Sequence, residues 1–130
     1  MSAVLLDTHV LLWLRTTPER IPAPALATLM SPDTELLVSA ASSWEIAIKY
    51  RLGKLQLPSR PQLWIPRALR ELAATPIDVD HESAAAVAAL PDHHRDPFDR
   101  LLVVQARQRR IRIATADHAF APYDVRTLAV

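Results

Sequence analysis

The chain contains no cysteine, and its 130 residues include a single glycine, Gly53. Without thiolates the protein forms neither a disulfide nor a cysteine-based zinc site, and it needs no oxidising compartment. Without a cluster of glycines it has no P-loop for phosphate and no dinucleotide-binding fingerprint. These absences exclude several common nucleotide-binding and redox functions.

Long apolar runs are also missing. The apolar runs present, such as segment 101–104, are far shorter than the roughly 20 residues that span a membrane. The first seven residues contain no basic region and reach an acid too early for a signal peptide. Half of the residues are apolar, which is usual for a globular protein. We therefore expect one cytoplasmic domain covering residues 1–130.

Positive charge comes almost wholly from arginine. Lys49 and Lys54 are the only lysines among fifteen basic residues, and the net charge is just +1. One cluster of arginines has two interpretations, which the sequence leaves open. It is either a solvated helix end, where cations complement the helix dipole, or a contact for nucleic-acid phosphates, which guanidinium groups match well. The cluster consists of Arg107, Arg109, Arg110 and Arg112.

Strand and helix patterns alternate along the chain with short connections. Short apolar runs predict strands at 3–6, 35–39, 75–80 and 111–115, with a fifth, edge strand at 125–130. Helices are predicted at 10–14, 25–30, 42–52, 67–74, 82–90 and 97–110. The proline-containing segment 54–66 is expected to be an irregular connection. This alternation is typical of an α/β fold, with a parallel sheet of four to five strands flanked by helices.

Four acidic residues come where the chain is expected to switch from strand to helix: Asp7, Glu45, Asp99 and Asp117. The carboxyl ends of neighbouring parallel strands share one crevice, so these acids can meet there. Carboxylates in one cleft repel each other unless a divalent cation holds them, and oxygen ligands suit Mg²⁺ or Mn²⁺. Such a site can hydrolyse phosphate esters. We predict direct metal ligation by Asp7 and Asp99, and outer-shell or second-metal roles for Glu45 and Asp117.

The acids also have structural explanations. Ser42 and Glu45 match the capping-box pattern at a helix start. Asp96 is a predicted N-cap, which would leave Asp99 in the first helical turn, where the dipole favours an acid. Asp117 could cap a short helix in the same way. The joint placement of the acids favours the metal site more than any single residue does.

The histidines suggest no transition-metal site. His93 and His94 are adjacent and lack the i,i+4 spacing of a helical zinc motif. We expect them, with His9 and His118, to be solvent-facing or satisfied by local hydrogen bonds. The tryptophans are expected to be core or interface anchors rather than surfaces for stacked bases: Trp13, Trp44 and Trp64.

Several short motifs together resemble the PIN-domain family. They are Asp7-Thr8-His9, Ser43-Trp44-Glu45-Ile46, Asp96-Pro97-Phe98-Asp99-Arg100-Leu101-Leu102 and Thr115-Ala116-Asp117. Their order and the length of the chain are similar, more narrowly, to the VapC toxins of bacterial type II toxin–antitoxin systems. The resemblance covers essentially the whole sequence.

The resemblance implies a Rossmann-like PIN domain that acts as an endoribonuclease and binds Mg²⁺ or Mn²⁺ in an acidic pocket. The family's pocket acids map here onto Asp7, Glu45, Asp99 and Asp117. Thr115 matches a hydroxyl residue that supports the pocket, whereas Asp96 is better explained as scaffold. The resemblance further implies a VapB-type antitoxin protein, an RNA substrate and a homodimer, with no membrane contact.

Two other functions remain open. A phosphatase with an aspartyl nucleophile also places an aspartate after its first strand, but it usually needs a second aspartate two positions later, where this chain has His9. Alternatively, the protein is a non-catalytic PIN domain in which the acids cap helices and the arginines hold RNA without cutting it.

Overall fold

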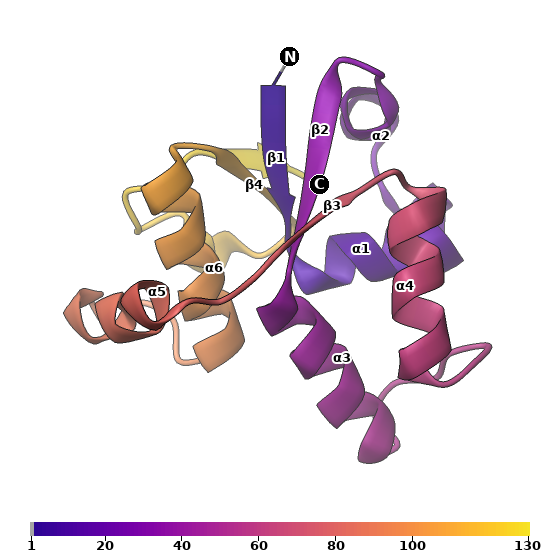
Figure 1. Cartoon of the computed structure of the whole chain (residues 1–130). Helices are drawn as coiled ribbons and strands as arrows, with labels where there is room; N and C mark the ends of the chain where they lie inside the picture. The colour runs from indigo at the N-terminus through magenta and orange to yellow at the C-terminus, as the bar shows by residue number, and fades with distance from the viewer. Residues whose placement is uncertain (1) are drawn as a thin grey trace.

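Five parallel strands form one sheet in the computed structural model, which describes residues 2–130 (Figure 1). The strands are β1 (Ser2–Leu6), β2 (Thr34–Ser39), β3 (Thr75–Ile77), β4 (Arg112–Thr115) and β5 (Thr127–Ala129). Their order is β3-β2-β1-β4-β5. The chain therefore builds the sheet from β1 to one edge and then returns to the other side of β1. The predicted α/β fold with a parallel sheet is confirmed.

Helices cover both faces of the sheet, with α1, α2 and α4 on one side and α5 and α6 on the other (Figure 1). Within residues 2–130, no helix combines the length and the apolar character needed to cross a membrane. The α-helices are α1 (Thr8–Thr16), α2 (Ala23–Met30), α3 (Ala40–Arg51), α4 (Pro61–Glu71), α5 (His81–Ala86) and α6 (Pro97–Arg109). Three short 3-10 helices are η1 (Pro18–Arg20), η2 (Val87–Ala89) and η3 (His118–Phe120).

The central strand β1 explains how the sheet is buried. Successive side chains of a strand point to opposite faces. Val4 and Leu6 pack with residues of α1, α2 and α4, whereas Leu5 packs with residues of α6 on the other face. All three side chains are fully buried. A strand covered on both faces requires a continuous apolar run, which is what the sequence has here.

The expectation of an irregular segment at 54–66 is wrong in its second half. Helix α4 begins at Pro61 and contains Pro66. Proline suits a first helical position, because the N–H there has no partner within the helix. Pro66 is exposed, while Trp64 and Ala68 on the same helix are buried in the core. Burial of this face maintains the helix although Pro66 donates no hydrogen bond.

Other element boundaries differ in detail. Strand β3 covers only the first part of the predicted segment 75–80, and it contains Pro76. Because β3 is an edge strand that pairs only with β2, the missing N–H of proline is tolerated. The predicted helix at 82–90 is divided between α5 and η2. Strand β5 lies at the opposite edge, as predicted, but is shorter than expected.

Helix α3 begins two residues earlier than predicted. Ser39 is its N-cap, and the Ser39 side chain accepts a hydrogen bond from the Ala41 amide at 3.0 Å. The predicted capping box between Ser42 and Glu45 is therefore wrong. The helix ends as expected near Gly53, whose φ of 73° lies in the left-handed region that glycine adopts at helix ends.

Candidate active site

The sheet topology brings the predicted acids to one place. Asp7 directly follows β1, and α3, which carries Glu45, follows β2. Asp117 follows β4, and Asp99 lies in the first turn of α6. The strands that follow β1 in the chain first extend the sheet on one side, through β2 and β3, and then on the other, through β4 and β5. The switch point lies between β1 and β4, and open α/β sheets usually bind ligands at such a point. The charges of Asp7, Glu45 and Asp117 all act on Asp99, so the four carboxyl groups form one cluster.

Asp7 is held by the neighbouring strand. The Asp7 side chain is buried, and its Oδ2 accepts a hydrogen bond from Thr115 Oγ1 at 2.7 Å. The Asp7 amide donates to the Ala114 carbonyl at 3.0 Å, which extends the pairing of β1 and β4 beyond the end of β1. Burial raises the pKa of Asp7, and the hydrogen bond from Thr115 opposes this rise. Thr115 therefore favours the charged form of Asp7.

Glu45 is buried but fully partnered. Thr8 Oγ1 donates to Glu45 Oε1 at 2.7 Å and lies 2.9 Å from Ser42 Oγ. Lys49 Nζ lies 2.5 Å from Glu45 Oε2, one turn along α3. Burial lowers the pKa of Lys49, but the hydrogen bond and charge of Glu45 raise it more, and the net shift is upward. The Glu45 carboxylate therefore bonds to Thr8 and Lys49 and does not cap α3.

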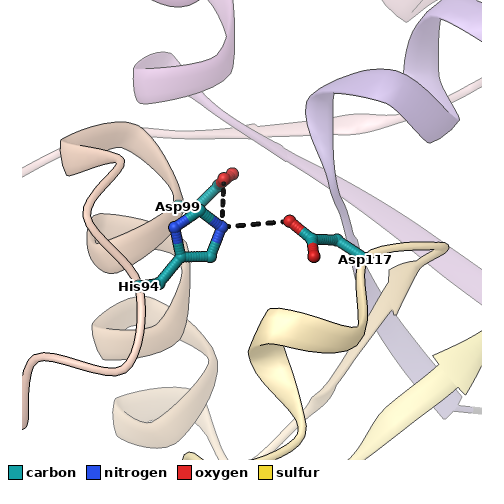
Figure 2. Close-up of side chains that lie close together, drawn as sticks. All are labelled: His94, Asp99 and Asp117. Atoms are coloured by element: carbon teal, nitrogen blue, oxygen red, sulfur yellow. Dashed lines mark hydrogen bonds and ion pairs between the residues drawn. The ribbon is translucent and has the colours of Figure 1, made fainter.

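His94 joins Asp99 and Asp117 at the outer side of the cluster. Figure 2 shows the His94 ring between these two carboxyl groups. Its Nε2 lies 2.9 Å from Asp99 Oδ2 and 3.0 Å from Asp117 Oδ2. The Nδ1 atom accepts a hydrogen bond from the Asp96 amide at 3.2 Å, so Nε2 carries the proton of the neutral ring. His94 is thus satisfied by hydrogen bonds, as expected, but its partners include two of the four predicted acids, which the sequence did not indicate.

The loop that carries His94 is held by long-range contacts. The His94 amide donates to Tyr123 Oη at 2.9 Å. Arg100, on α6, donates through Nη1 to the carbonyls of Pro91 at 3.0 Å and His94 at 3.3 Å, and through Nη2 to that of Val87 at 3.1 Å. The only sequence signal for this arrangement is the position of His94 two residues before the N-cap Asp96.

The carboxyl group of Asp99 has a strongly raised pKa. Burial, followed by the charges of Asp7, Asp96, Glu45 and Asp117, raises the pKa of Asp99 to about 8. The pKa of Asp117 shifts in the opposite direction, because the Ala119 amide and His94 hydrogen-bond to its carboxylate. Asp99 is therefore largely protonated at neutral pH unless a cation balances its neighbours.

Two of the acids cap helices. Asp96 Oδ1 accepts from the amides of Phe98 at 2.8 Å and Asp99 at 3.2 Å, which confirms Asp96 as the N-cap of α6. Asp117 Oδ1 accepts from the Ala119 amide at 2.9 Å and caps η3. Because Asp117 Oδ2 faces His94, Asp117 caps a helix and belongs to the cluster at once.

The residues of the cluster fit a divalent cation. His94, Asp99 and Asp117 each offer one ligand atom, and these atoms lie within 4.8 Å of one another. Carboxylate oxygens suit Mg²⁺ and Mn²⁺. His94 Nε2 would join them as a ligand only after losing the proton that faces the two carboxyl groups. Burial and the negative charges of neighbouring acids raise the pKa of Asp99. A bound cation would offset the repulsion between these charges. The arrangement is therefore a possible acidic metal-binding group.

Comparison with known proteins identifies the family. Residues 4–125 match the family model described as PIN domain. Ribonuclease VapC22 of Mycobacterium tuberculosis (strain ATCC 25618 / H37Rv) is 33% identical over 118 residues, covering 90% of this chain and 88% of that protein. Ribonuclease VapC16 of the same organism is 48% identical over 50 residues, which cover 38% of this chain and only 36% of that protein.

A solved structure shares the fold. The crystal structure of VapBC-5 from Mycobacterium tuberculosis, a member of the VapBC family of toxin–antitoxin systems, superposes with a TM-score of 0.62. The match covers 100% of both chains at 19% sequence identity, so it supports the fold alone. The match to the family model and the likeness to VapC22 show that the chain belongs to the PIN-domain family and, within it, to the VapC proteins.

Proposed function

We propose that this protein is an endoribonuclease, the toxin of a toxin–antitoxin pair, and that it hydrolyses RNA phosphodiesters with a divalent cation at the acidic cluster. The match to VapC22 along nearly the whole chain carries this proposal. The cluster gives it a chemical basis, since four carboxyl groups from separate parts of the sequence converge at the carboxyl edge of the sheet.

The residues of the cluster have distinct proposed roles. Asp7 and Asp99 hold Mg²⁺ or Mn²⁺ directly, and Glu45 and Asp117 act as outer-shell or second-metal groups. When bound, the cation lowers the pKa of water and stabilises charge on the phosphoryl oxygens. Thr115 keeps Asp7 charged and oriented through its 2.7 Å hydrogen bond.

The proposed function also implies binding partners. Because VapBC-5 belongs to a family of toxin–antitoxin systems, we infer a VapB-type antitoxin for this chain. A homodimer is also part of the proposal. Several large apolar side chains on the surface are available for contacts with other protein chains. They include Met30, Trp44, Leu52 and Leu63.

RNA binding without cleavage is the weaker alternative. That reading treats the acids as helix caps. Of the four acids, Asp117 caps a helix through its side chain, whereas the Asp7 side chain makes no capping hydrogen bond. Glu45 bonds to Thr8 and Lys49 instead of capping α3. Helix capping therefore does not account for the buried carboxylates.

The proposal is tested by sequencing RNA ends after brief expression of the wild type and Asp7→Asn. Defined new ends are expected in the wild type alone, because the asparagine keeps the size of Asp7 but removes its charge. Asp92→Asn is the matched control, since that side chain is 98% exposed. Identical ends in wild type and Asp7→Asn would reject the nuclease, and release of inorganic phosphate from monoesters would favour the phosphatase.

A further inference from the structure

A groove of about 490 Å³ lies beside the acidic cluster, between α1, η1 and the C-terminal part of α3. It is continuous with the cluster, because Thr8 and Lys49 line the groove and both contact Glu45. None of the described residues that line it is acidic. Its basic and imidazole side chains are His9, Arg20, Lys49 and Lys54.

Two of these cations are available to a ligand. Arg20 and Lys54 are exposed, and within residues 2–130 neither forms an ion pair. By contrast, Arg15 and Arg67, on the neighbouring part of the surface, both pair with Glu71. The groove therefore concentrates free positive charge next to a cluster of negative charge, in a chain whose net charge is only +1.

Arg20 is also oriented toward the groove wall. Its guanidinium carbon lies 4.8 Å from the centre of the Trp13 ring, within the range of a cation–π contact. Trp13 lines the same groove, and the His9 ring lies 6.2 Å from it. The flat face of Trp13 restricts the position of the Arg20 guanidinium, and the N–H groups of Arg20 remain free to bind a phosphate.

We infer that this groove binds backbone phosphates of the RNA strand next to the bond that is cut, with Arg20 and Lys54 as the principal contacts. The inference rests on the proposed function. The acidic cluster repels a polyanion, so a strand that places one phosphate there requires compensating cations for the adjoining phosphates. The groove supplies them at the border of the cluster.

The arginines at the end of α6 do not serve this purpose. Arg107 and Arg109 lie in the last turns of α6, whereas Asp99 lies in the first. Arg109 follows Asp99 by ten positions in the helix, which is roughly 15 Å along the axis. These two exposed arginines therefore provide a matched control, because their removal changes the net charge by the same amount.

The first experiment measures binding of a short fluorescein-labelled single-stranded RNA of mixed sequence by anisotropy, in EDTA, over a range of salt concentrations. Arg20→Ala/Lys54→Ala should lower the salt slope by about 1.4, or about 0.7 for each lost phosphate contact, and raise Kd about 20-fold near 0.1 M salt. Arg107→Ala/Arg109→Ala should change Kd by no more than about twofold, and Arg20→Lys/Lys54→Arg should retain the wild-type slope. Unchanged binding in the groove variant, an equal loss in the control, or no binding by the wild type overturns the inference.

The second experiment separates this inference from the proposed function. With Mg²⁺ present, the groove variant should cleave the same RNA with a raised KM and a kcat close to that of the wild type. If the wild type fails to cleave while the groove variant still loses binding, the proposed function fails and the groove remains an RNA site. If the wild type cleaves and the groove variant matches it in Kd, salt slope and KM, the groove inference is wrong and the surface serves another ligand.

Discussion

Asp7 and Glu45 lie deep in the site, and each accepts a hydrogen bond from a threonine hydroxyl. Asp99 and Asp117 lie at the starts of α6 and η3 and share the ring of His94. The inner pair is thus fixed by hydrogen bonds from residues on neighbouring elements. The outer pair is held by His94, which lies in a loop, and the negative charges of the neighbouring acids still raise the pKa of Asp99.

The difference shows where a cation matters most. Burial raises the pKa of both Asp7 and Asp99, but Thr115 opposes the rise at Asp7. At Asp99 the four surrounding acids add to the rise. We therefore assign the response to metal and pH mainly to the outer half, and structural support mainly to the inner half.

The largest expected effect comes from Asp99→Asn. The substitution removes a proposed metal ligand and should reduce RNA cleavage by about 10³-fold or more, in the range found when central catalytic groups are removed. Purified protein and a defined RNA give the measurement. Asp92→Asn, at an exposed loop position, should retain full activity. Wild-type cleavage by Asp99→Asn would remove the outer half from the chemistry.

Thr115→Val tests the support of the inner half. It leaves Asp7 buried without its hydroxyl partner, which should cost about 1–3 kcal/mol of unfolding free energy. It should also raise the pKa of Asp7 further, so the pH at which cleavage is half-maximal moves upward. Thr115→Ser restores the hydroxyl and should restore the profile. A pH profile that is the same in valine and wild-type proteins would contradict the assigned role.

Without metal, stability should fall as pH rises, because of Asp99. A carboxyl whose pKa in the folded protein exceeds its usual value of 3.8 stabilises the fold fully below that value, and this stability is lost as pH rises toward about 8. Thermal unfolding in EDTA should therefore give a lower Tm at pH 8 than at pH 5.5. A loss of about 1 kcal/mol corresponds to roughly 4 °C in a domain of this size.

Asp99→Asn should flatten this dependence, and Mg²⁺ or Mn²⁺ should restore the wild-type Tm at the higher pH. Equal slopes in Asp99→Asn and wild type would show that another group causes the dependence.

The smallest effect is expected at Asp96. Asparagine caps helices about as well as aspartate, so Asp96→Asn should keep both stability and most of the cleavage activity. Asp96→Ala removes the cap of α6 and should cost about 1 kcal/mol in chemical unfolding. A large loss of cleavage in a stable Asp96→Asn protein would instead place Asp96 among the metal-binding residues.

Most of the fold was predictable because its signals are local. The apolar run before Asp7 indicates a strand buried on both faces, and Asp96 followed by Pro97 marks the start of α6. Helix α4 was not fully predictable, because Pro66 opposes it locally and the burial of Trp64 decides the outcome.

The site was predictable as a set of acids but not in its contacts. The local pattern offered a capping box of Ser42 and Glu45 as the structural explanation, whereas tertiary contacts with Thr8 and Lys49 determine the position of Glu45. His94 was missed because it reaches Asp99 and Asp117 only when its loop is held by distant residues. Such contacts form only in the folded protein, so the spacing of residues along the sequence does not predict them.

The most direct test of the central claim is the metal dependence of RNA cleavage by the purified wild-type protein. The RNA is first incubated with protein in EDTA, and Mg²⁺ or Mn²⁺ is then added in excess, with Asp7→Asn treated in parallel. We predict no cleavage in EDTA, rapid cleavage by the wild type after the metal is added, and none by Asp7→Asn. Cleavage that persists in EDTA, or that appears equally in Asp7→Asn, would contradict a metal-dependent site built from these acids.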